Sequence, residues 1–305
     1  MLTLFVDVVL PVFVVAATGY LGHRLLSMQV QTLSAVTLYI FSPALVLSSL
    51  TRSTLSAQEA LQIVGFALSF AAIMYLLSWI AAKLFRLGRE LESAFLLSTL
   101  FMNSGNYGLS VALLAFGEEG LQRALIFFVL QAIMGGTLAV FVASRSSLGL
   151  MASVGSVLRI PHMYAALSAL AINATGVPLP SFIANSAEIL GRAAIPAMLI
   201  VLGMQLGQRL EIEYPGALAV AVSMRLIFSA GMALGLTQLI GIGDLTQKVL
   251  IVQASMPTAV FAVIVATQFN ARPRFVAGAV ILSTLASILT ITLLLAAVTG
   301  KIAVF

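Results

Sequence analysis

The sequence has no cysteine and very few charged residues. The absence of cysteine from 305 residues excludes a disulfide, a thiolate nucleophile and a cysteine-ligated metal site. Lysine and arginine total 15 and aspartate and glutamate total 10, so only 8% of the chain is charged. Soluble proteins carry about 25% charged residues, because a surface that faces water needs them. The composition therefore excludes a soluble enzyme, a nucleic-acid-binding domain and a disordered chain.

Hydrophobic residues make up 61% of the chain and occur in long continuous runs. A bilayer core of about 30 Å is crossed by roughly 20 apolar residues in a helix. Strands of a membrane barrel would instead alternate over about ten residues. The sequence therefore predicts an all-α polytopic protein of the cytoplasmic membrane with ten transmembrane helices. The predicted spans are 3–22, 32–50, 60–82, 93–116, 121–143, 160–176, 183–206, 217–240, 245–268 and 275–298.

The basic residues are unevenly divided between the two sides of the predicted membrane. Loops opposite the termini hold nine of them, and loops on the terminal side hold five. Because cytoplasmic loops carry the excess of basic residues, both termini are predicted to be extracytoplasmic. The longest connection, Ser144–Ile160, is then cytoplasmic and is predicted to lie on the membrane surface as a short amphipathic helix. Membrane lipid is an expected partner, and nucleic acid is not.

The two halves of the chain resemble each other. Pro43 in the second span and Pro196 in the seventh are each followed by alanine and lie 153 positions apart. Polar interruptions at Asn103–Gly108 and Ser255–Thr258, in spans four and nine, lie about 151 positions apart. Each half holds five spans, and an odd number makes the halves enter the membrane from opposite sides. The sequence therefore predicts two inverted five-helix repeats, residues 1–150 and 151–305.

The interruptions in spans four and nine predict broken helices. Gly105 and Gly108 in the fourth span are poor residues for a helix interior. In the ninth span Pro257 removes a backbone donor and suits the first turn of a new half-helix. Broken helices in opposite halves are predicted to cross at the midplane, where their half-helix N-termini attract an anion.

The polar residues around the breaks form the candidate site. In the alternative interpretation the asparagines only bond helices together and Pro257 is only a kink, but the matched pair of breaks favours binding. Arg225, about 12 Å into the eighth span, either attracts an anionic substrate or extends to the cytoplasmic headgroups, and its depth favours the headgroups. The predicted substrate-binding residues are Asn103, Asn106, Tyr107, Ser255, Pro257 and Thr258, with Gln253 and Arg225 as accessory residues.

The ordered set of motifs resembles the auxin efflux carrier family, and in particular its bacterial, malonate-carrier-like members. The matching stretches are Asn103-Ser104-Gly105-Asn106-Tyr107-Gly108-Leu109, Ser255-Met256-Pro257-Thr258-Ala259 and the two Pro-Ala segments. The resemblance implies a fold like those of bile-acid symporters and sodium/proton antiporters, in which crossed helices belong to a mobile transport part. It also implies a homodimer and elevator-type movement. In plant members a crossover asparagine, which aligns with Asn103, helps to hold the substrate carboxylate.

The resemblance further implies a scaffold part of about 1–52 and 160–209 and a transport part of about 58–144 and 216–300. The chain departs from the family pattern at two places. Ser110 stands where the family has a proline, and the third span lacks the carboxylate of plant auxin carriers. These differences weaken the case for auxin as substrate and for the same proton-linked support site.

Other classes of protein fit the sequence less well than a secondary transporter. There is no H-E-x-x-H motif, no intramembrane aspartate pair and no G-x-S-x-G motif, which argues against an enzyme. His23 and His162 lie at loop edges and do not indicate a metal site. We expect no cofactor and a carrier of a small organic anion, a carboxylate, with the coupling ion (proton, sodium or none) left open. The alternatives are a sodium- or proton-coupled symporter and a channel, although an inverted repeat favours a carrier.

Overall fold

The computed structural model describes residues 1–144, 160–208 and 210–300, and within these its regular elements are all helices. This arrangement confirms the predicted helical class. The predicted surface helix within Ser144–Ile160 lies almost entirely outside the described residues. The first half contains α1 (Leu2–Leu4), η1 (Phe5–Val9), α2 (Leu10–Leu26), α3 (Val30–Val36), η2 (Thr37–Phe41), α4 (Ser42–Leu50), α5 (Ala57–Leu84), α6 (Arg89–Leu100), η3 (Ser104–Leu109), α7 (Ser110–Met134), η4 (Gly135–Ala139) and α8 (Val140–Ser144).

The second half repeats this pattern of long helices with short interruptions. The elements labelled η are π-helical turns, in which the backbone bonds reach one residue further than in an α-helix. The second half contains α10 (Pro161–Thr175), α11 (Ser181–Leu206), α12 (Pro215–Ser223), η5 (Met224–Phe228), α13 (Ser229–Ile240), α14 (Asp244–Ala254), α15 (Phe261–Gln268) and α16 (Pro273–Val298).

Seven helical stretches of the described chain are long and apolar enough to cross a membrane. The longest of them is bent at Gly117, whose φ of +67° lies in the left-handed region that favours glycine. These lengths and compositions make the chain an integral multi-pass membrane protein. The seven stretches are Leu2–Leu26, Val30–Leu50, Ala57–Leu84, Ser104–Ala143, Ser181–Leu206, Pro215–Ile240 and Pro273–Val298.

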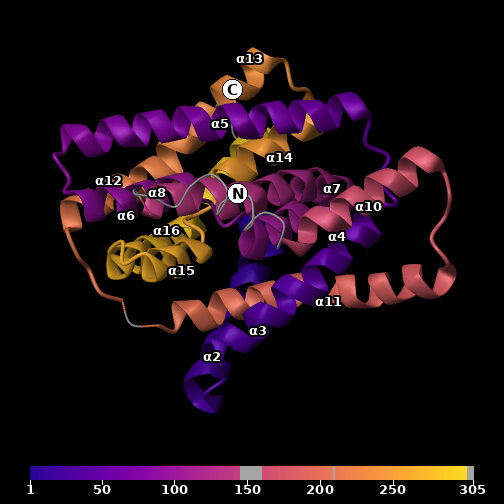
Figure 1. Cartoon of the computed structure of the whole chain (residues 1–305), viewed down its shortest axis with the longest axis horizontal. Coiled ribbons are helices and arrows are strands. Elements are labelled where there is room, and N and C mark those ends of the chain that lie inside the picture. Colours follow the sequence, from indigo (N-terminus) through magenta and orange to yellow (C-terminus); the bar gives the residue numbers. More distant parts are fainter. Residues whose placement is uncertain (145–159, 209, 301–305) are drawn as a thin grey trace.

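The helices pack in two groups that each combine segments from both halves of the chain. In the first group α11 packs against α2 and α4, and α10 packs against α4. In the second group α5 packs on α6 and α7, α14 on α7 and α13, and α16 on α6. Figure 1 shows the first group in the lower and right-hand part of the molecule and the second in the upper and left-hand part.

Close backbone contact holds α2 and α11 together in the first group. A side chain at Gly203 of α11 would overlap the carbonyl oxygen of Ala16 in α2. A side chain at Gly19 of α2 would likewise overlap the carbonyl oxygen of Ile200. Small residues allow such contact between helices, and in lipid this packing replaces the hydrophobic force that acts in water.

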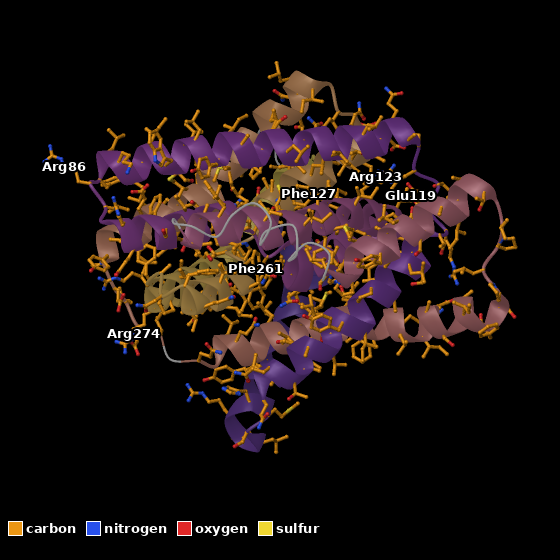
Figure 2. All side chains as sticks on the ribbon, in the orientation of Figure 1. Arg86, Glu119, Arg123, Phe127, Phe261 and Arg274 are labelled. Carbon is orange, nitrogen blue, oxygen red and sulfur yellow. The ribbon has the colours of Figure 1, made fainter. Side chains whose placement is uncertain are left out.

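Charged side chains gather at two opposite ends of the molecule. Figure 2 shows Arg86 and Arg274 at one end and Glu119 and Arg123 at the other, with Phe127 and Phe261 between them. At the second end the Arg123 guanidinium bonds the Glu59 carboxylate at 2.7 Å. An apolar middle between two charged ends is the arrangement that a lipid bilayer requires.

Candidate functional site

The two interrupted segments cross and pair through their backbones. α6 ends at Leu100 and α14 ends at Ala254, and the extended residues that follow form an antiparallel bridge between Met102 and Thr258. The Asn103 N–H donates to the Pro257 carbonyl at 2.7 Å, and the Ala259 N–H donates to the Phe101 carbonyl at 2.8 Å. Each break therefore satisfies backbone groups that the other break leaves without an intrahelical partner.

Asn103 stands at the end of the first break, immediately before η3. Its carbonyl accepts a 2.9 Å bond from the Gly108 N–H and so closes the first π-helical turn. The Asn103 side chain is 5% exposed, and its amide nitrogen has no hydrogen-bond partner among the described residues. A buried amide donor without a partner costs about 1–3 kcal/mol unless a ligand or water accepts from it.

Asn106 and Tyr107 follow Asn103 on the same turn but lie in different surroundings. Asn106 is half-buried, whereas Tyr107 is fully buried and packs edge-to-face on Phe13 at 5.7 Å between ring centroids. The Tyr107 hydroxyl lies beside Ser287 of α16. Of these two residues, only Asn106 lies in a partly open position.

The second break is built mainly from backbone groups. The Ser255 hydroxyl donates to the Ile251 carbonyl of its own helix at 2.6 Å. The Thr258 hydroxyl donates to the Ser98 carbonyl at 2.8 Å, and the Thr258 N–H donates to the Ser283 hydroxyl at 3.0 Å. Both Ser255 and Thr258 therefore already have partners within the protein.

Pro257 differs from its expected place at the start of a half-helix. It lies in the extended stretch between α14 and α15, and α15 begins only at Phe261 with Val260 at its N-cap. The proline leaves the bridge intact because the bridge uses its carbonyl and not its missing N–H. A proline that follows a helix break can therefore either begin the next helix or belong to an extended segment, and the sequence does not distinguish the two.

Gln253, in the last turn of α14, has a fully buried side chain. Neither of its amide atoms has a partner within the described part of the chain. Its side chain packs directly over Gly108, where a Cβ would collide with the Gln253 side-chain oxygen. Gln253 and Asn103 thus bring to the same crossing two amide nitrogens that have no partner among the described residues.

Arg225 points into the protein interior, which makes the expectation that it extends to the headgroups wrong. Its side chain is fully buried on η5. One guanidinium nitrogen donates to the Thr99 carbonyl at 2.7 Å and the other donates to the Ala254 carbonyl. The two carbonyls belong to α6 and α14, so the depth of Arg225 within its own predicted span could not reveal these contacts.

His162 lies at a loop edge as expected, in the first turn of α10. It is fully buried, with its Nε2 2.6 Å from the Ser42 hydroxyl and its ring edge-to-face with Phe128. Phe128 in turn packs against Gly105, so His162 connects indirectly to the first break. No pattern in the sequence pairs His162 with Ser42, which lies 120 positions earlier.

A cavity of about 610 Å³ lies between the two packing groups, and Arg192 and Glu118 are among the residues that line it. Leu45 and Pro196 line it from the first group and Leu113 from the second. At its rim Arg52 donates to the Glu188 carboxylate, which raises the pKa of this arginine above its usual value. The lining of the cavity thus includes both charged residues and the Pro196 segment of α11.

Comparison with known proteins supports a transport role. The model of a family described as "Membrane transport protein" matches residues 4–154 and 150–295. A protein of Methanocaldococcus jannaschii called an uncharacterized transporter is 26% identical over 298 residues, which cover 94% of this chain and 96% of the relative. An uncharacterized transporter of Methanothermobacter thermautotrophicus is 28% identical over 287 residues, which cover 92% of each chain.

These relatives are transporters, which confirms that the chain is not an enzyme. The family match also confirms the resemblance that the motifs around Asn103 and Pro257 predict. Its two matched stretches together include both breaks and both Pro-Ala segments. The chain therefore belongs to this family of membrane transport proteins, which includes the auxin efflux carriers.

Proposed function

We propose that this transporter moves a small organic anion, a carboxylate, which it binds at the crossing of the two breaks. The observation that carries the proposal is the pair of buried amides of Asn103 and Gln253 beside this crossing, whose nitrogens have no hydrogen-bond partner among the described residues. Amide donors and helix N-termini hold a carboxylate without requiring a side-chain cation in contact with it. Asn106, half-buried on the same turn, is the further contact that we propose.

The membrane arrangement that we propose has ten crossings in two inverted halves. The fourth crossing joins α6 to η3 and to α7 as far as Gly117, and the ninth joins α14 to α15. Neither α6, α14 nor α15 is long enough to cross alone, and α10, with 15 residues, is a short sixth crossing. The reciprocal bonds of the Met102–Thr258 bridge support an inverted relation, because an antiparallel bridge has a local twofold axis.

The transport mechanism that we propose is alternating access of the elevator type, in a homodimer. The two packing groups support a scaffold part containing α2–α4, α10 and α11 and a transport part containing α5–α8 and α12–α16. The cavity between Pro196 and Leu113 lies where the two parts meet, which suits an access route for the substrate. Movement of one group past the other would then carry the crossing between the two sides.

The orientation that we propose places both termini outside the cytoplasm. A reporter that is active only in the cytoplasm, fused after Phe305, should give no signal, because the excess of basic residues lies on the opposite loops. The same reporter inserted after Arg86 should be active. A strong signal from the C-terminal fusion would contradict the orientation.

The experiment that tests the function is uptake by proteoliposomes that contain the purified full-length protein. Radiolabelled mono- and dicarboxylates should give saturable uptake that is accelerated by the same compound on the opposite side. Flux that rises linearly with concentration would instead indicate a channel, and uptake that requires a sodium or pH gradient would indicate a coupled symporter. Absence of uptake for every carboxylate would contradict the proposed substrate class.

A further inference from the structure

Arg225 carries a buried positive charge that is offset in an unusual way. Its guanidinium bonds the carbonyls of Thr99 and Ala254 and lies 5.8 Å from the centre of the Phe70 ring. Within residues 1–144, 160–208 and 210–300, no carboxylate lies within ion-pair distance of it. A fully buried guanidinium without a carboxylate requires another source of negative potential.

Two helix ends supply this potential. Thr99 lies in the last turn of α6 and Ala254 is the last residue of α14. Carbonyls at helix C-termini lack intrahelical partners, and each helix end is equivalent to roughly half a negative charge. Arg225 therefore joins the C-terminal ends of both half-helices before the crossing and offsets their charge of about one unit.

The sum of charges at the crossing then depends on Arg225. Two half-helices begin after the crossing, and their N-terminal ends together carry about one positive unit. Because Arg225 already offsets the two C-terminal ends, this positive unit is left unbalanced, in surroundings where an unbalanced charge is costly. A ligand with one negative charge makes the occupied crossing neutral, whereas a ligand with two makes it negative.

We propose that Arg225 is the positioning and charge-setting residue of this site, and that it makes the site selective for anions that carry one negative charge. It holds the ends of α6 and α14 together and does not itself contact the substrate. Its Nε, which has no partner in the described structure, adds to the positive potential. This inference rests on the proposed function, because it concerns the anion bound at the same crossing.

The first test compares malonate with malonamate, which are similar in size but carry two charges and one charge at neutral pH. Each is added over a concentration series to the purified wild-type protein, and its effect on the unfolding temperature is measured. Malonamate should stabilise the protein at a concentration at least about tenfold lower than malonate, because the second charge is left unbalanced. Equal potency, or a preference for malonate, would overturn the proposal.

The second test uses variants of the arginine. Arg225→Met should lower the unfolding temperature by roughly 5–10 °C, because it leaves two buried carbonyls without a donor. Guanidinium chloride at about 10 mM should restore part of the loss, whereas potassium chloride should not. Arg225→Lys keeps the charge and should keep the preference for malonamate. A wild-type unfolding temperature for Arg225→Met, or loss of the preference in a folded Arg225→Lys protein, would overturn the proposal.

Arg274→Met is the matched control, because Arg274 is exposed, pairs with Glu211 and does not line the cavity. It should leave the unfolding temperature and the malonamate preference unchanged, and guanidinium should have no effect on it. If neither compound binds and no carboxylate is taken up, the proposed substrate class fails. The positioning role of Arg225 is still decided in that case, by the loss of stability and its recovery with guanidinium.

Discussion

The two breaks share a backbone arrangement but differ in the side chains that they carry. The bridge pairs Met102 with Thr258, which lies 156 positions later, so Asn103 corresponds to Ala259 and Gly108 corresponds to Ile264. The first break restarts as a π-helical turn at Ser104. The second remains non-helical until Phe261. The difference indicates that the backbone of both breaks builds the crossing. Of the two amides that we propose for the ligand, Asn103 belongs to the first break itself, whereas Gln253 belongs to the helix that precedes the second break.

This comparison is tested most severely at Gly108. Gly108→Leu should destabilise the fold by about 3 kcal/mol or more, because the new side chain would overlap Gln253 in a fully packed position. The measurement is the unfolding temperature and the yield of monodisperse protein in detergent. The matched control is Ile264→Leu at the corresponding position, which is 64% exposed and should change stability by less than about 0.5 kcal/mol. Similar effects in both variants would show that the two breaks are equally packed.

Thr258→Val tests the structural role of the second break. It should cost about 2 kcal/mol, because it leaves the buried Ser98 carbonyl without its 2.8 Å donor while keeping the shape of the side chain. Thermal unfolding measures the loss. Thr267→Val is the control, since the exposed Thr267 hydroxyl bonds only a carbonyl of its own helix. A Thr258→Val protein as stable as the wild type would show that the bond from Thr258 to the Ser98 carbonyl does not stabilise the crossing.

Asn103→Ala tests the ligand-binding role of the first break. It should weaken carboxylate binding by about 1.5 kcal/mol, or roughly tenfold, and leave stability nearly unchanged, because its amide nitrogen has no partner in the described protein. Binding and unfolding temperature are measured on the same preparation. Asn173→Ala should show the opposite pattern, since the Asn173 amide bonds the Leu50 carbonyl at 2.8 Å. Wild-type affinity in a folded Asn103→Ala protein would leave helix bonding as the better interpretation.

The smallest effect is expected at Ser255. Ser255→Ala should change both binding and stability by less than about 0.5 kcal/mol, because this hydroxyl bonds the Ile251 carbonyl of its own helix. The same binding assay measures it. A tenfold loss of affinity would show that Ser255 turns toward the ligand, and would make the second break a side-chain contributor after all.

Hydropathy predicts the helical segments well and their ends less well. The third span is predicted as 60–82 and is observed as Ala57–Leu84. Its start is fixed by a capping box in which Ser56 and Glu59 bond each other's backbone N–H groups. Apolar composition shows which residues prefer lipid, but capping groups and interfacial residues extend the helix beyond them.

The register of the two breaks and the place of Arg225 could not be predicted from the sequence. Matching polar residues pairs Asn103–Gly108 with Ser255–Thr258 at an offset of about 151, whereas the backbone bonds give 156. The polar residues serve different purposes in the two halves, so their similarity does not fix the register. The sequence misplaces Arg225 because its partners, Thr99 and Ala254, come from helices far away in the sequence.

The π-helical turn η5 has a consequence for insertions and deletions. Such a turn contains one residue more than the α-helical turn that would replace it. Removal of one residue from Met224–Phe228 would therefore restore a regular helix and leave every later side chain of α13 on its present face. Removal of one residue from α13 itself would rotate the following part of that helix by about 100°. A one-residue deletion at η5 would thus keep the membrane-facing side chains of α13 on their present face. It would, however, change the direction in which the Arg225 guanidinium of η5 points.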